Sequence, residues 1–345
     1  MLVPLIKNKI PFIDVRAPNE FLVGAVPTSI NLPILSNDER IEVGKIYKEN
    51  GNLAAMEKGY SLVSGKIKNK RISNWIQFVE NNPTAQVYCA RGGQRSKIAQ
   101  SWLKEIGVDI DIVEGGFKAL RNTCLDILDS ASRDNKEWII IAGKTGSGKT
   151  KMIQQINNSI DLEGLANHRG SAFGSFETPQ PTPINFENNL AYQYLSISSS
   201  KIFFEDESKT IGRVVIPEKF FDKMTSSKLV LIEEPIENRI QNIYDEYVKK
   251  GIKNNDQTEL SKTLLRKLEK ISKRLGGTNF KIVDNLIRSA FEKNDKEIHF
   301  EWIKQLLVNY YDKMYSYQLN QKKDRCIKSG DWAEVKQYIL NRSRT

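Results

Sequence analysis

The chain has 345 residues, which is long enough for two domains that each bury a core. Its 39% hydrophobic and 27% charged residues exclude a disordered or fibrous protein. The net charge of +10 favours an anionic partner without identifying it, because a modest basic excess is often only a solvated surface.

Targeting, membrane and disulfide classes are also disfavoured. The apolar run at the N-terminus is too short for a secretory signal, and the run at 138–142 has the length of a strand, far below a bilayer span. Three cysteines make no disulfide framework, and no Cys/His pair has metal-ligand spacing. We therefore expect a cytoplasmic protein without a membrane partner.

Residues 1–130 alternate between strand and helix patterns. Apolar runs at 10–16, 87–89 and 110–113 predict strands, and residues 96–106 have apolar positions at helical spacing before Gly107. This alternation indicates an α/β domain with a parallel sheet. Residues 37–70 are polar and helical in pattern, and we interpret them as an insertion that shapes a substrate surface.

A reactive cysteine is predicted at the end of the strand 87–89. The sequence Cys-Ala-Arg-Gly-Gly-Gln-Arg-Ser at 89–96 places Cys89 where backbone amides and a helix N-terminus converge, which favours a thiolate. Arg91 and Arg95 add positive charge to hold a chalcogen or an oxyanion. The alternative is a buried structural cysteine. Cys124 and Cys326 lack such a setting, and we expect them to be inert.

With Asp14, Arg16, Glu20 and Gly24, this loop resembles the rhodanese-like sulfurtransferase domain. The resemblance implies that Cys89 carries a persulfide-type group and that Asp14 and Arg16 support the loop. Ala25 and Thr28 depart from the usual rhodanese pattern. The spacing also fits a cysteine-dependent phosphatase, although no general-acid Asp follows in a recognisable position.

Residues 131–345 are predicted to form a second α/β domain that begins with a phosphate-binding loop. The polar stretch 129–136 marks the boundary, and the strand 138–142 leads into Gly-Lys-Thr-Gly-Ser-Gly-Lys-Thr at 143–150. Lys149 would meet the outer phosphate, and Thr150 is suited to Mg²⁺. The residues expected to bind the phosphates are Gly143, Thr145, Gly146, Ser147, Gly148, Lys149 and Thr150.

Two further segments follow the loop. Residues 161–174 form a glycine-punctuated turn that carries His168 and Arg169, which we interpret as catalytic, the alternative being a loop stabilised by hydrogen bonds. Further strands are predicted at 201–205 and 228–233, and three acids follow the first of these. Asp206, or alternatively Glu205, is the expected second ligand of a possible magnesium ion with Thr150. From about residue 237 the pattern is basic and helical to the end.

The chain as a whole resembles the tRNA 2-selenouridine synthase family, in which a rhodanese-like domain is fused to a P-loop domain. The stretches that carry the resemblance are 89–96, 143–150, 161–174, 180–181 and 205–208. It implies a transferase that replaces sulfur by selenium in wobble-position 2-thiouridine of tRNA. The sulfur is first alkylated by geranyl diphosphate, and selenium from selenophosphate then displaces the S-geranyl group.

The resemblance also implies binding partners, and two alternative functions remain open. The partners are a tRNA carrying 2-thiouridine and an enzyme that supplies selenophosphate, and ATP is not expected to be required. One alternative function is that of an ATP-dependent tRNA sulfurtransferase. The other is that of a non-catalytic module whose two loops only bind anions. Basic C-terminal helices would form a tRNA phosphate surface.

Overall fold

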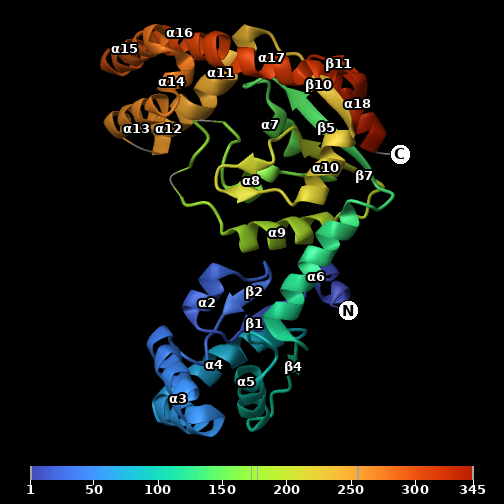
Figure 1. Ribbon diagram of the computed structural model, residues 1–345, viewed down its shortest axis with the longest axis vertical. Coiled ribbons are helices and arrows are strands. Elements are labelled where there is room, and N and C mark those ends of the chain that lie inside the picture. Colours follow the sequence, from blue (N-terminus) through green and yellow to red (C-terminus); the bar gives the residue numbers. More distant parts are fainter. Residues whose placement is uncertain (1, 172, 177, 255, 344–345) are drawn as a thin grey trace. The chain divides into compact units, whose positions relative to one another are not determined.

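The computed structural model describes residues 2–171, 173–176, 178–254 and 256–343 (Figure 1). The chain divides into two compact units, of which the first is Met1–Arg133 with Pro181–Ser196 and the second is Asp134–Gln180 with Ile197–Thr345. Each unit contains a parallel sheet, as the alternation of strand and helix patterns predicts.

The first unit is built on a four-stranded parallel sheet of order β2-β1-β3-β4. Its strands are β1 (Phe12–Asp14), β2 (Ser29–Asn31), β3 (Gln86–Tyr88) and β4 (Asp111–Ile112). Its helices are α1 (Val3–Lys7), α2 (Pro18–Val23), α3 (Asn37–Leu62), α4 (Gly65–Asn81), α5 (Gln94–Lys104), α6 (Gly116–Ala131) and α9 (Pro183–Ser196). Because the strands are parallel, their carboxyl ends share one edge, and Cys89 follows β3 at that edge.

The polar segment 37–70 is helical, as its pattern predicts, and comprises α3 and the start of α4. A capping box at Ser36 and Glu39 starts α3, and Gly51, with a φ of 82°, interrupts it. Trp75 on α4 is 1% exposed and donates its indole N–H to the Leu32 carbonyl at 2.9 Å. This burial fixes the helical segment to the sheet core.

Helix α9 belongs to the first unit although it lies far along the chain. Asn188 is fully buried and donates to the Ala25 carbonyl at 2.8 Å, while the Asn185 side chain accepts from the Ala25 amide at 2.8 Å. Arg121 on α6 donates to Asn188 at 2.8 Å. A strand-helix pattern cannot show this long-range packing.

The second unit contains a five-stranded parallel sheet of order β11-β10-β5-β7-β6 and a separate antiparallel hairpin, β8 and β9. The strands are β5 (Glu137–Gly143), β6 (Ser159–Ile160), β7 (Lys201–Glu205), β8 (Thr210–Ile211), β9 (Val214–Val215), β10 (Lys228–Ile232) and β11 (Cys326–Gly330). The strands expected at 138–142, 201–205 and 228–233 are thus confirmed.

The expectation of helix to the end of the chain is wrong at β11. Residues Cys326–Gly330 pair in parallel with β10 and complete one edge of the sheet. The basic and polar residues around this strand hid it, because an edge strand needs no continuous apolar run. Cys326 therefore lies in a strand, where its thiol donates to the Lys328 carbonyl at 3.4 Å.

Most of the remaining second unit is helical. The α-helices are α7 (Lys149–Ile153), α8 (Leu162–Ala166), α10 (Glu218–Ser226), α11 (Ile236–Ile243), α12 (Lys250–Asn254), α13 (Gln257–Glu269), α14 (Ser272–Leu275), α15 (Gly277–Lys293), α16 (Lys296–Leu306), α17 (Asp312–Asn320) and α18 (Trp332–Ser343). Two π-helical segments, η1 (Tyr244–Lys249) and η2 (Leu307–Tyr311), and the 3₁₀ turn η3 (Lys323–Arg325) complete them.

These helices bury a core of their own, separate from the core under the sheet. It gathers apolar side chains from α11, η1, α13, α15, α16 and η2. Buried His299 accepts the Trp302 indole N–H at 3.0 Å in this core, and burial lowers its pKa to about 4, which supports a packing role. Among the described residues, no helix is long and apolar enough to cross a bilayer.

Candidate functional site

The Cys89 loop connects β3 to α5 and surrounds the thiol with hydrogen-bond donors. Cys89 is 3% exposed. The Gly93 amide donates to Sγ at 3.1 Å, and the Ser96 hydroxyl lies 3.3 Å from it. Burial raises the thiol pKa, but hydrogen bonds from the Ser96 hydroxyl and from the amides of Ser96, Arg91 and Gly93 outweigh it, so the Cys89 pKa is lowered from its ordinary value. The loop is thus arranged to stabilise a thiolate.

A second glycine turn, at the start of α6, supports this loop from its carbonyl side. The amides of Phe117 and Lys118 donate to the carbonyls of Cys89 and Ala90 at 2.8 and 3.0 Å. Gly116 has a φ of 59°, and a Cβ there would lie 2.3 Å from the Cys89 carbonyl oxygen. Only glycine therefore allows this close approach.

The two arginines of the loop differ in their surroundings. Arg91 is exposed, and no ion pair to it is found among the described residues. Arg95 is bound by Glu20 of α2, at 2.5 Å from Nη1 to Oε2 and 3.0 Å from Nη2 to Oε1. Only Arg91 is therefore free of a carboxylate in this state.

Asp14 and Arg16 form a buried ion pair at the end of β1, with 2.5 Å between Nη2 and Oδ2. Arg16 also donates to the Gly24 carbonyl at 2.7 Å and lies 3.9 Å from the centre of the Phe117 ring. These contacts join β1, α2 and α6 beneath the Cys89 loop. Cys124 is fully buried on α6, and burial raises its pKa to about 12, so it is an unreactive thiol.

The phosphate-binding loop connects the central strand β5 to the short helix α7. Gly146 and Gly148 both have a φ of 82°, which turns successive amides inward. Ser147 is 1% exposed, and its hydroxyl has no hydrogen-bond partner among the described residues. The loop therefore offers unfilled donor capacity in its interior.

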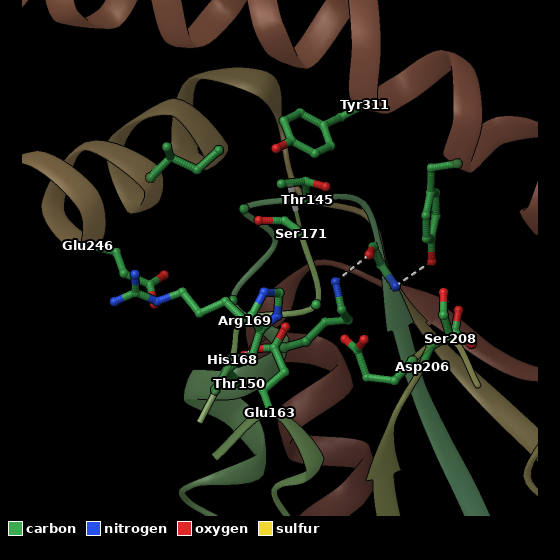
Figure 2. Close-up of a pocket in the computed structure, with 18 of the residues that line it drawn as sticks. Thr145, Thr150, Glu163, His168, Arg169, Ser171, Asp206, Ser208, Glu246 and Tyr311 are labelled. Atoms are coloured by element: carbon green, nitrogen blue, oxygen red, sulfur yellow. Dashed lines mark hydrogen bonds and ion pairs between the residues drawn. The ribbon is translucent and has the colours of Figure 1, made fainter. Parts of the chain in front are cut away.

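The two side chains of this loop that are expected to bind ligand have internal partners. Lys149 donates from Nζ to the Gly143 carbonyl at 2.7 Å. Thr150, which lies next to Glu163 in Figure 2, donates from Oγ1 to that carboxylate at 2.8 Å. An anion entering the loop would take over the Lys149 ammonium from a neutral carbonyl, which is a favourable exchange.

The helical segments of the second unit hold the loop from outside. Arg239 of α11 is 2% exposed, donates to the Thr145 carbonyl at 2.9 Å and forms a two-point ion pair with Asp312 at 2.9 and 2.6 Å. The Tyr315 hydroxyl accepts from the Gly143 amide at 2.6 Å, and Asn242 donates to the Gly146 carbonyl at 2.9 Å. These anchors come from the C-terminal region, and the sequence motif does not reveal them.

Three glutamates form a protonatable cluster beside Lys149. Glu205 is fully buried, and one of its carboxylate oxygens accepts the Glu163 amide at 3.2 Å. Burial is the largest cause that raises the pKa of each of Glu163, Glu205 and Glu207. Repulsion from Glu163 raises the pKa of Glu205 and Glu207 further, and the pKa of Glu207 is about 8. The Lys149 ammonium and hydrogen bonds with Thr150 and Glu207 offset part of the increase at Glu163. Part of this cluster therefore carries protons near neutral pH.

Thr150 and Asp206, the residues expected to hold magnesium, both line the cavity described below but have other partners in this structure. Asp206 is bound by Lys322 at 2.6 and 2.8 Å, whereas Thr150 bonds to Glu163. Among the described residues, no group of three or more His, Cys, Asp or Glu side chains is arranged to hold a metal ion. The donor set does not fit a preformed magnesium site, and we derive no step through a metal ion.

His168 and Arg169 lie together on the segment that follows α8, as labelled in Figure 2. The His168 Nδ1 atom is buried and has no hydrogen-bond partner among the described residues. Burial, with Lys267 and Lys270 nearby, lowers the His168 pKa, so its imidazole is neutral near pH 7. Arg169 forms an ion pair with Glu246 at 2.8 Å and lies 4.5 Å from the ring centres of both Phe176 and Tyr247.

The phosphate-binding loop, His168 and Arg169 line one cavity of about 1410 Å³. Its basic lining residues are Lys149, Lys151, Arg169, Lys209, Lys250, Lys270, Arg274, Lys322 and Arg325, and its acidic ones are Asp161, Glu163, Asp206, Glu207, Asp245 and Glu246. Aromatic and apolar side chains also line it, namely Phe176, Phe221, Met224, Ile243, Tyr247, Tyr310, Tyr311, Met314 and Tyr315. A ligand that combines phosphates with an apolar body matches this mixed lining.

Sequence reasoning missed several residues of the two sites. Glu163 and Glu207 lie in the segments 161–174 and 205–208 that the sequence motifs indicate. Their interactions with Thr150 and Lys149 of the P-loop were not predicted. Arg239, Asp312 and Lys322 carried no local signal, because a single charged residue in a polar, helix-like sequence is usually solvated. The only sequence signal for the burial of Arg239 was the pair of apolar residues near it, Ile236 and Ile240.

Fold and sites together define a class: proteins in which a rhodanese-like domain with a polarised cysteine is joined to a P-loop domain. The comparisons agree. Residues 3–123 match the model of the rhodanese-like domain, and residues 136–345 match the model described as the tRNA 2-selenouridine synthase AAA domain.

Relatives named tRNA 2-selenouridine synthase match nearly the whole chain. The protein from Sulfurovum sp. (strain NBC37-1) is 42% identical over 97% of this chain and 96% of its own length. The one from Psychromonas ingrahamii (strain DSM 17664 / CCUG 51855 / 37) is 43% identical, with 96% and 94% covered. The chain belongs to the tRNA 2-selenouridine synthase family.

Proposed function

We propose that the chain replaces the sulfur of wobble-position 2-thiouridine in tRNA by selenium in two steps. Geranyl diphosphate first alkylates the sulfur, and selenium from selenophosphate then displaces the S-geranyl group. The observation that carries this proposal is the cavity that a phosphate-binding loop lines together with aromatic and apolar side chains, in a chain that also holds a thiolate-stabilising loop.

In the first step the thiocarbonyl sulfur forms a bond to the allylic carbon of geranyl diphosphate, the C–O bond breaks, and pyrophosphate leaves. Negative charge grows on the departing oxygen. The inward amides of the P-loop and the Lys149 ammonium stabilise this charge, which lowers the barrier because they are in place before the bond breaks. No nucleotide hydrolysis enters the balance.

The same step releases the proton on N3 of the base, so a proton acceptor is required. His168 supplies one in this proposal, since its imidazole is neutral near pH 7 and the residue lines the cavity. Arg169 acts as a positioning residue, because Glu246 and two aromatic rings already hold its guanidinium.

In the second step a selenium nucleophile adds to C2 of the alkylated base, and the geranyl thiolate leaves. Alkylation makes the sulfur a competent leaving group. Cys89 delivers the selenium in this proposal: its thiolate attacks the phosphorus of selenophosphate, the P–Se bond breaks to release selenide as the nucleophile, and water then removes the phosphoryl group from sulfur as phosphate. Arg91 neutralises the selenophosphate anion. Arg95 contributes indirectly by holding α2 against the loop through Glu20. A separate enzyme must supply selenophosphate, and the tRNA anticodon loop presents an already unpaired base at low cost.

The test is mass spectrometry of nucleosides from 2-thiouridine tRNA incubated with the protein and geranyl diphosphate, with and without selenophosphate. Lys149→Ala should leave the 2-thiouridine unmodified, because the leaving group loses its cation. Cys89→Ala should accumulate S-geranyl-2-thiouridine, because only the second step needs the thiol. Lys144→Ala is the matched control, since that P-loop lysine points to Asp312 at 3.5 Å.

Other outcomes would overturn the proposal. If ATP is hydrolysed in step with product and geranyl diphosphate is ignored, the chain is an ATP-dependent sulfurtransferase. If Cys89→Ala and Lys149→Ala both leave tRNA modification unchanged, the two loops only bind anions. If both variants stop at unmodified 2-thiouridine, the assignment of one step to each loop is wrong.

A further inference from the structure

A small apolar recess opens behind the P-loop, inside the helical core of the second unit. It has a volume of about 30 Å³ and is lined by Thr145, Ser171, Phe173, Ile243, Tyr247, Trp302, Ile303, Leu306, Leu307 and Tyr311. Its inner wall is apolar, because Phe173, Ile303, Leu306 and Leu307 line it, and all four are buried. A space of this size and lining holds a small apolar group more readily than water.

The recess adjoins the phosphate cavity. Five residues line both: Thr145, Ser171, Ile243, Tyr247 and Tyr311. Figure 2 shows Tyr311, Thr145 and Ser171 close together at the helical side of the P-loop. The Ser171 hydroxyl lies 3.3 Å from the Tyr247 hydroxyl, so a pair of polar groups stands where the two spaces meet. A ligand with its phosphates on the loop would therefore meet this opening with its apolar part.

Both π-helical segments of the fold that the structure describes border the recess. Tyr247 belongs to η1, and Leu307 and Tyr311 belong to η2. A π-helical turn is rare and occurs frequently at functional sites, where it redirects side chains that a regular helix would place elsewhere. Two such segments border one recess, which indicates that the shape of the recess has a functional role and is not only a packing defect.

We propose that this recess receives the distal end of the prenyl chain and sets the chain length that the P-loop domain accepts. The inference rests on the function proposed above. The recess is too small for a whole geranyl chain, so it takes the terminal dimethyl group, and the rest of the chain lies along Ile243, Tyr247 and Tyr311 in the main cavity. Burial of this end contributes the hydrophobic part of the binding energy.

The test compares dimethylallyl, geranyl and farnesyl diphosphate as alkyl donors. Leu306→Ala enlarges the recess and should shift the kcat/KM ratio of farnesyl to geranyl diphosphate about tenfold toward farnesyl, since one or two methylene groups in an apolar pocket change specificity by that order. The matched control is Leu264→Ala, which removes the same atoms from the same core at a position that does not line the recess. It should leave the ratio unchanged.

A folding control and a milder substitution allow the specificity change in Leu306→Ala to be interpreted. Inhibition by inorganic pyrophosphate should be unchanged in both variants, which verifies a folded P-loop. If Leu306→Ala fails to fold, Ile303→Val removes one methyl group and should shift the same ratio about two- to threefold. An unchanged ratio in a folded recess variant overturns this inference alone, whereas a wild-type protein that uses none of the three donors overturns the proposed function itself.

Discussion

The Cys89 loop and the P-loop share a plan, since each follows a buried parallel strand, turns on glycines and leads into a helix, but they differ in readiness. The donors around Cys89 already bond to its sulfur, which lowers the thiol pKa before any substrate arrives. In the P-loop, Lys149 bonds to the Gly143 carbonyl and Thr150 to Glu163. The first site is preorganised, and the second must exchange internal partners for its ligand.

The means of support differ as well. The Cys89 loop is held mainly by its own unit through short backbone contacts with the start of α6. The P-loop is held by side chains from far along the chain, above all Arg239 and its partner Asp312. The difference agrees with the proposed roles, in which the Cys89 loop is a fixed site for the selenium step and the P-loop exchanges partners when its ligand binds.

The largest effect should come from removing the buried anchor of the P-loop. Arg239→Ala leaves Asp312 without its main partner and frees the Thr145 carbonyl, so we expect a loss of about 3–5 kcal/mol in the free energy of unfolding. Urea unfolding followed by circular dichroism measures it. Lys144→Ala, whose side chain is 40% exposed, should cost less than ~1 kcal/mol. Equal losses in the two variants would show that the P-loop does not depend on this anchor.

Gly116→Ala tests the packing under the Cys89 loop. A Cβ would meet the Cys89 carbonyl oxygen at 2.3 Å and would also force a non-glycine residue to a φ of 59°, so we expect about 3 kcal/mol of destabilisation and a slower selenation step. Gly107→Ala is the control, since its φ is 83° but nothing lies within 4 Å of the new Cβ. It should cost about 1–2 kcal/mol from backbone strain alone.

The difference between those two variants isolates the clash. If Gly107→Ala destabilises the protein as much as Gly116→Ala, backbone strain is the whole effect, and the close approach under Cys89 has no consequence. Thermal unfolding of both variants, with nucleoside analysis of the selenated product, gives the two readouts.

The smallest effect concerns the pH dependence of Cys89. Its lowered pKa means that the thiolate is present above that pKa, so wild-type reactivity should persist to lower pH than for an ordinary thiol. Ser96→Ala removes the hydroxyl donor and should move the reactivity profile to higher pH, with an approximately tenfold lower rate at pH 7.

The measurement is the rate of modification of the Cys89 peptide by a small methanethiosulfonate reagent across pH, read by mass spectrometry. Ser101→Ala on the exposed side of the same helix should leave the profile unchanged. A Ser96→Ala profile that coincides with the wild type would show that the backbone amides alone set the pKa.

Much of the fold was predictable because the strongest signals are local. The apolar runs before Cys89 and Gly143 are short buried strands, and the glycine-rich stretches after them favour tight turns into helices. Arg91 and Arg95 were equivalent in the sequence, but the structure separates them, because Glu20 lies close to only one. Strand β11 escaped prediction because edge strands carry weak apolar patterns.

The sequence by itself determined the two loops, their strand–turn–helix settings and the membership of the family, since these depend on residues that are neighbours in the chain. Only the tertiary structure decided which side chains complete the sites: the Glu20–Arg95, Arg239–Asp312 and Asp206–Lys322 pairs, the raised pKa values of the glutamate cluster, and the recess between η1 and η2. Burial and charge pairing arise from segments brought together by folding, and no local pattern records which segments meet.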